Sequence, residues 1–176
     1  MSLQIYILSK LMEENSYPYK LKKALSEPLP ISELANLTES KLYYHFESLL
    51  KKQLIEEVEI IQEDNRPDKH VFAITEKGRA QLPKMVYRMF EKAKSPADML
   101  VGISTMQYVD LIRVKSILTA KLEDIERKQH TRQHMQQQID TESATMPYIQ
   151  AFSTYFDEAT EAYVHLLKTL IHTLDN

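Results

Sequence analysis

The sequence predicts a mainly α-helical protein with one small β-hairpin, followed by a long antiparallel pair of helices. Its 176 residues are 43% hydrophobic, which is enough for one good core or two small ones. Apolar side chains recur at helical spacing through most of the chain and give way once to a β-branched run. Only two glycines are present, so folds that need many positive-φ positions are disfavoured.

The composition also excludes several kinds of site. Because the chain has no cysteine, disulfides, thiolate nucleophiles and cysteine-based zinc sites are excluded, and a reducing, cytoplasmic location is expected. The N-terminal stretch is apolar for only about ten residues before Lys10, Glu13 and Glu14 interrupt it. We therefore expect neither a signal peptide nor a membrane span.

Two short helices are expected before residue 30. The first covers residues 2–14, and its apolar side chains share one face: Leu3, Ile7, Leu8 and Leu11. The second begins at Pro18, whose missing N–H is harmless in the first turn of a helix. It ends before Glu27 and Pro28, and residues 31–37 form a brief connector.

Residues 38–55, TESKLYYHFESLLKKQLI, are predicted to form a helix with two different faces. Thr38 suits an N-cap, and Leu42, Phe46 and Leu49 follow the spacing i, i+4, i+7 of an apolar stripe. Polar and aromatic side chains occupy the rest of the circumference: Ser40, Lys41, Tyr44, His45 and Lys51. The helix runs into a β-rich segment, as the recognition helix of a winged helix-turn-helix does.

A β-hairpin is predicted next. Its first strand is a β-branched run in which Val58 and Ile60 share a face, and its second covers residues 70–75 with Phe72 and Ile74 inward. The sequence Asn-Arg-Pro-Asp at residues 65–68 is typical of a turn. Thr75 is expected to cap a further helix. This order predicts a winged helix-turn-helix domain over residues 1–82.

The same residues resemble the PadR family of transcriptional regulators. The motifs that carry the likeness are, in chain order, Pro18-Tyr19-Lys20-Leu21, Leu42-Tyr43 with Phe46 and Leu49, Leu54-Ile55, and Phe72-Ala73-Ile74-Thr75-Glu76-Lys77-Gly78. Three residues depart from the family pattern: Pro18 stands at a usual glycine, Gln53 replaces the glycine before Leu-Ile, and Phe72 replaces a tyrosine. The resemblance implies a DNA-binding repressor with helical dimerisation arms, released by a small hydrophobic or phenolic effector.

Residues 83–104 are expected to form a helical connector and residues 105–176 a C-terminal dimerisation domain. Pro83 and Ser95-Pro96 divide the connector into two short helical runs. A helix of about thirty-five residues is predicted from Thr105, and another begins at Pro147. Two long apolar stripes need a further partner, which a second subunit supplies. The dimer contacts are assigned to Leu118, Leu122, Phe152, Phe156, Tyr163, Leu166 and Leu170.

The candidate DNA contacts lie on the helix of residues 38–55 and in the hairpin. They are Thr38, Ser40, Lys41, Tyr43, Tyr44, His45, Arg66 and Lys69. Two alternatives stay open, because the aromatic side chains of residues 43–45 also suit packing, and Arg66 and Lys69 also fit as ordinary loop charges. The formal net charge of −3 gives no general attraction to DNA, so basic side chains must cluster locally to bind phosphate.

A methionine-rich set follows the hairpin and fits either a hydrophobic core or an effector pocket: Met85, Met89, Phe90, Met99, Met106 and Tyr108. His130 and His134 stand four residues apart without a third ligand, so a solvated helix face is expected, with neither a metal nor another cofactor. The sequence has neither a nucleophile elbow nor an acid–base pair in an apolar cleft, which argues against an enzyme.

These observations predict a homodimeric regulator that binds a pseudo-palindromic DNA operator through paired winged helices. The alternative is a winged-helix module that binds another protein and does not bind DNA. The slight excess of acidic over basic side chains favours that alternative.

Overall fold

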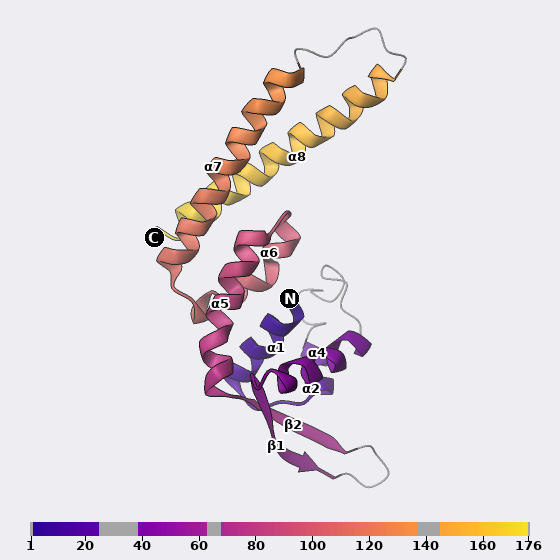
Figure 1. Ribbon diagram of the computed structural model, residues 1–176, viewed down its shortest axis with the longest axis vertical. Helices are drawn as coiled ribbons and strands as arrows, with labels where there is room; N and C mark the ends of the chain where they lie inside the picture. Colours follow the sequence, from indigo (N-terminus) through magenta and orange to yellow (C-terminus); the bar gives the residue numbers. More distant parts are fainter. Residues whose placement is uncertain (1, 25–38, 63–67, 137–144, 176) are drawn as a thin grey trace. The chain divides into compact units, whose positions relative to one another are not determined.

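A computed structural model describes residues 2–24, 39–62, 68–136 and 145–175, without the side chains of residues 39, 40 and 132–136 (Figure 1). The chain divides into two compact units, Met1–Asp110 and Leu111–Asn176. In the first unit, α1 (Ser2–Glu13), α2 (Pro18–Ala24) and α4 (Glu39–Lys51) precede the hairpin of β1 (Ile55–Ile61) and β2 (Lys69–Ile74). Two helices follow, α5 (Glu76–Lys92) and α6 (Pro96–Ile103). The mainly helical class with one antiparallel hairpin is confirmed.

Helix α1 lies at the centre of the first unit. It packs against α4, α5, α6 and β2, so almost its whole circumference is buried. The predicted stripe of Leu3, Ile7, Leu8 and Leu11 is buried, and Ile5 on another face is buried as well. A helix enclosed on several sides gains hydrophobic burial at nearly every position.

The hairpin pairs β1 with β2 from Ile55 opposite Ile74 to Ile61 opposite Lys69. The register shifts between Glu57 and Glu59, which is a β-bulge, and Val58 and Ile60 both lie exposed. Phe72 and Ile74 face the core as predicted. Phe72 also exchanges two backbone hydrogen bonds with Ser16, of 2.8 and 3.0 Å, so the segment before α2 adds a third strand contact.

The junction between α4 and β1 is a Schellman motif. The Leu54 N–H donates to Leu49 O at 3.0 Å and the Gln53 N–H donates to Leu50 O at 2.8 Å. Gln53 therefore occupies the left-handed position after the helix, with φ of 60°. Gly78 lies against this turn, since a Cβ there would stand 2.1 Å from the Leu54 carbonyl oxygen.

Helix α5 begins as predicted, with the Thr75 hydroxyl accepting from the Gly78 N–H at 3.0 Å. The predicted interruption at Pro83 is wrong, because α5 continues through it to Lys92. Leu82 and Val86 on either side of the proline are fully buried, and this packing offsets the lost backbone hydrogen bond. Residues 83–104 consequently pack within the first unit. Helix α6 starts at a capping box of Ser95 and Asp98.

The second unit consists of α7 (Leu111–Gln136) and α8 (Met146–Thr173), two long helices side by side (Figure 1). Ion pairs join Lys115 to Asp175, and Glu126 to Lys168 at 2.8 Å, so the helices are antiparallel. The predicted start at Thr105 is wrong, because Met106–Tyr108 forms a 3-10 turn and α7 begins at Leu111. None of the described helices is long and apolar enough to cross a membrane.

Candidate nucleic-acid interface

Helix α4 turns one face inward and one outward. Leu42, Phe46 and Leu49 are buried as predicted, and Phe46 packs against Phe72 with ring centroids 5.1 Å apart. Tyr44 lies roughly opposite this stripe on helical spacing and is 67% exposed. Lys51 is exposed on the same outer face and extends the positive charge to the end of the helix.

The remaining candidates flank this outer face. Lys41 is exposed on one flank, and Tyr43 on the other is 48% exposed. Lys69 at the start of β2 is half-buried, and its Nζ lies 5.5 Å from the centroid of the Tyr17 ring. Three predicted contacts lie outside the described residues or side chains: Thr38, Ser40 and Arg66.

His45 is half-buried beside Tyr44, with ring centroids 5.4 Å apart in an edge-to-face arrangement. Its Nδ1 is buried and has no hydrogen-bond partner within the described part of the chain. Burial lowers the pKa of His45, and the nearby positive charges of Lys52 and Lys41 lower it further. The ring is therefore neutral at neutral pH and adds no charge to the outer face.

Basic and acidic side chains are unevenly distributed around α4. Lys52, just after α4, donates to Gln4 Oε1 at 3.4 Å, so it ties the end of this helix to α1. The wing is acidic on β1, where Glu56, Glu57 and Glu59 are all exposed. Among the described residues on and beside α4, accessible positive charge therefore lies at Lys41, Lys51 and Lys69.

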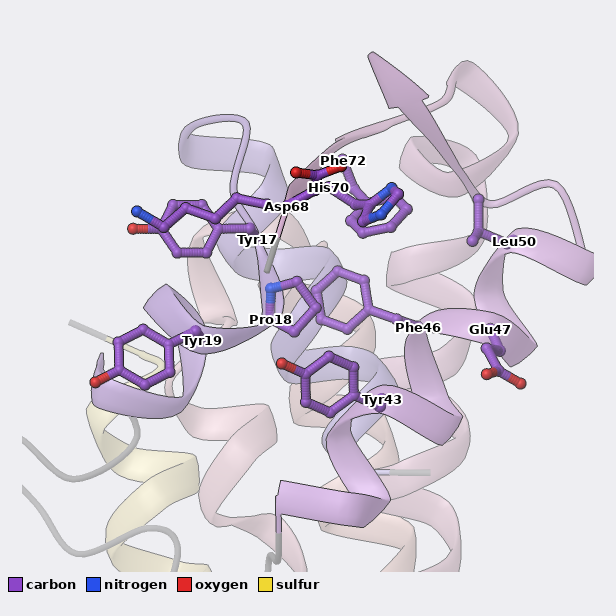
Figure 2. A pocket seen from close by; sticks show the side chains of 11 residues that line it. Tyr17, Pro18, Tyr19, Tyr43, Phe46, Glu47, Leu50, Asp68, His70 and Phe72 are labelled. Atoms are coloured by element: carbon purple, nitrogen blue, oxygen red, sulfur yellow. The ribbon is translucent and has the colours of Figure 1, made fainter. Parts of the chain in front are cut away.

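A cavity of about 470 Å³ opens between the start of α2, one flank of α4 and the start of β2. Its lining residues come from these three segments: Tyr17, Pro18 and Tyr19; Tyr43, Phe46, Glu47 and Leu50; Asp68, Lys69, His70 and Phe72. Figure 2 shows the rings of Tyr43 and Phe46 extending from α4 toward Pro18 and Tyr17. Two residues predicted to contact DNA, Tyr43 and Lys69, thus also form cavity walls.

Most residues of this cavity were missed from the sequence. Tyr17 and Tyr19 flank Pro18, and the Tyr-Pro-Tyr triplet indicated only the start of a helix. On α4, residues 43, 46, 47 and 50 share one side at helical spacing, which is a signal that the sequence carries. The partner segments become neighbours only through the Ser16–Phe72 pairing, which no local pattern reveals.

The first unit has the helices and the β-hairpin of a winged-helix domain. Its sequence was compared with models of known protein families. Residues 7–84 match the family model described as the transcriptional regulator PadR-like family. This winged-helix domain belongs to the PadR-like family of transcriptional regulators. The expected resemblance is therefore confirmed, and the family consists of regulators and not of enzymes.

Solved structures of PadR proteins are also similar, at low identity. Bacillus subtilis PadR in complex with operator DNA is 15% identical over 99% of both chains, with a TM-score of 0.42. The same protein in complex with p-coumaric acid is 15% identical over 100% of both chains, with a TM-score of 0.39. The PadR-like regulator BC1756 from Bacillus cereus is 18% identical over 99% of this chain and 96% of its own, with a TM-score of 0.42. Curated protein sequences gave no match.

The methionine-rich set lies just beyond the matched PadR-like segment, and much of it is core. Met89, Phe90 and Met99 are buried. A Cβ on Gly102 would stand 2.1 Å from Met89 Cε and 2.9 Å from the Phe90 ring, so α5 and α6 pack closely there. Three members are half-buried and keep some accessible surface: Met85, Met106 and Tyr108.

The residues assigned to dimerisation fall into two groups. Leu118 is fully buried between α7 and α8, with Val114 and Leu167, so it holds the pair of one chain together. Phe152 and Phe156 are 66% and 51% exposed, and their rings stack with centroids 6.5 Å apart. The others are half-buried: Leu122, Tyr163, Leu166 and Leu170. The described residues thus leave an aromatic face of α8 uncovered.

No group of three or more His, Cys, Asp or Glu side chains within the described residues is placed to hold a metal ion. His130 is exposed on α7, while the side chain of His134 lies outside the described ones.

Proposed function

We propose that this PadR-like protein is a transcriptional repressor that binds a pseudo-palindromic operator as a homodimer. The observation that carries the proposal is the outer face of α4, where Tyr44 and Lys51 are exposed opposite a buried apolar stripe and Lys41 is exposed on the flank. A helix of about four turns with such a face fits the major groove, with basic and hydroxyl groups at the phosphates. Operator binding would place the protein in the cytoplasm, with the chromosome.

The homodimer rests on the uncovered face of α8. Five large apolar or aromatic side chains there are exposed: Tyr148, Ile149, Phe152, Tyr155 and Phe156. An apolar surface of this kind on a two-helix arm is typical of a subunit interface. A two-fold axis through the arms would present two α4 helices to two half-sites.

Release by a small hydrophobic or phenolic effector is the regulatory part of the proposal. The half-buried side chains of Met85, Met106 and Tyr108 would line its site, and Met89 and Phe90, which are buried on α5, would form its packed wall. An effector that prefers a spacing of the two winged helices unsuited to the operator weakens DNA binding by its differential affinity.

A salt titration of binding to DNA from the promoter upstream of its own gene tests the DNA-binding proposal. Each neutralised phosphate contributes about −0.9 to the slope of log K against log salt, so a steep decline with salt is expected. Sequence-specific binding at low salt should exceed binding to a scrambled duplex. A chain that shows no preference for any promoter fragment at low salt is not an operator-binding protein.

A protein-interaction module is the second candidate, and the acidic wing favours it. Glu56, Glu57 and Glu59 on β1 would repel phosphate if the wing approached the DNA backbone. Neutralising all three with glutamine separates the candidates. The change should strengthen DNA binding in a regulator whose wing lies near the duplex, whereas an interaction module gains no specific DNA binding from it.

A further inference from the structure

We propose that the cavity between α2, α4 and β2 binds a small organic cation that has an aromatic or apolar body. Its volume of about 470 Å³ lies within the range of sites for small molecules, roughly 300–1,000 Å³. Every wall of the cavity belongs to the winged-helix unit. It is thus distinct from the methionine-rich set on α5 and the 3-10 turn.

The floor of the cavity is apolar and rigid. Phe46, Phe72 and Pro18 are buried, and the two phenyl rings pack on each other. Tyr17 and Tyr43 add two further rings to the walls (Figure 2). Aromatic faces carry negative potential, so a cavity with this lining favours an apolar body that bears a positive charge.

Two carboxylates give the cavity its charge preference. Glu47 lines the cavity from α4 and Asp68 from the residue just before β2, and both are exposed to solvent. Of the two basic groups, Lys69 already lies over the Tyr17 ring, and His70 Nδ1 lies 3.1 Å from the Glu57 carboxylate on β1. The lining therefore has two carboxylates and one lysine, so its net charge is negative and it would repel an anionic ligand.

The position of the Lys69 ammonium shows that this lining accepts a cation. Its Nζ lies 5.5 Å from the Tyr17 ring centroid, which is the geometry of a cation–π contact. A ligand ammonium over the ring of Tyr43 would use the same chemistry, and the carboxylates of Glu47 and Asp68 would add attraction from the rim of the cavity.

Occupancy of the cavity would act on DNA binding directly. Tyr43 and Lys69 are shared by the cavity and the proposed DNA contacts, so a bound ligand would hold them away from phosphates. This consequence rests on the proposed function, whereas ligand binding itself does not.

Isothermal titration calorimetry of the full chain, without DNA, tests the binding. The probes are 3-phenylpropylamine and 3-phenylpropionate, which share one body and carry opposite charges. The amine should bind about tenfold more tightly than the acid at low salt. Glu47→Gln and Asp68→Asn should each weaken the amine several-fold, while Glu56→Gln on β1, the matched control outside the cavity, should leave it unchanged.

Three results would overturn the proposal: neither probe binds at millimolar concentration, both bind equally, or Glu56→Gln weakens the amine as much as Glu47→Gln does. Because both cavity carboxylates are exposed, thermal melts by circular dichroism should match wild type and verify folding.

A second measurement uses a promoter duplex. The amine should weaken DNA binding by the wild-type chain and lose this effect in the Glu47→Gln/Asp68→Asn double variant. If the chain binds no duplex at all, the proposed function fails, while the calorimetric result still decides the cation site.

Discussion

Replacing Gln53 with glycine is expected to stabilise the first unit. Gln53 is the C′ residue of the Schellman motif after α4, with φ of 60°. The left-handed conformation costs a residue with a Cβ about 1–2 kcal/mol. Glycine avoids this cost but loses about 0.5–1 kcal/mol through the greater freedom of the unfolded chain. The difference favours Gln53→Gly by about 1 kcal/mol, or about 4 °C in Tm.

Urea denaturation measures the change in the free energy of unfolding, and amide exchange at Leu54 reports locally on the turn. The Gln53 carbonyl accepts from the Thr75 hydroxyl at 2.8 Å, and this backbone acceptor survives every substitution. Gln53→Ala is the matched control, because it removes the amide but keeps the Cβ, and it should be near neutral. Gln53→Val should destabilise by about 1 kcal/mol, since β-branched side chains suit positive φ poorly. Equal gains from glycine and alanine would show that backbone strain is not the cause.

Four further predictions follow from the structure. Gly78→Ala should destabilise by about 3 kcal/mol in urea, because its Cβ would meet the Leu54 backbone oxygen; Gly102→Ala should cost less, because its first contact is the flexible end of Met89. Lys41→Ala and Tyr44→Ala should each weaken DNA binding in a mobility-shift assay and leave the mass in solution unchanged; a loss of dimer would assign these side chains to an interface. Phe152→Glu and Phe156→Glu should halve the mass by light scattering, and unchanged mass would refute the α8 interface; Thr154→Glu, on the opposite face, is the control. Burial raises the pKa of Tyr6 to about 12, with Glu13 adding to the shift. The contribution of neutral Tyr6 to the free energy of unfolding is thus fully present below pH about 10 and is lost as the pH rises toward 12. Tyr6→Phe should remove this loss of stability from thermal melts at alkaline pH.

Periodicity predicted the helices and the buried face of α4 because it records which side of each element meets the core. Leu42, Phe46 and Leu49 are buried as their spacing required. The same reasoning failed at Pro83, where a local rule predicted a break and tertiary packing of Leu82 and Val86 kept α5 continuous. It also gave no sign of the bulge at Val58, because the register is set by the partner strand.

The accessible surface of the candidate interface was predictable in part. The spacing of α4 placed Lys41 and Tyr44 on accessible surface, but it did not separate the outer face from the flank that forms the cavity. Tyr43 shows why: it lines a cavity together with Tyr17 and Asp68, which come from segments more than twenty residues away on either side. Such long-range proximity depends on the tertiary fold, so the periodicity of the sequence does not predict it.

The thin interior of the α7–α8 pair would link the stability of this unit to the concentration of the protein if the proposed dimer forms. Val114, Leu118 and Leu167 are its fully buried apolar side chains among the described residues, and two helices with so little core are marginal alone. If a second copy covers the aromatic face of α8, ordering of the arms becomes a bimolecular event, and their melting temperature rises with concentration. On dilution the arms would then melt before the winged helix, and the cellular level of the protein would itself set the fraction able to bind both half-sites.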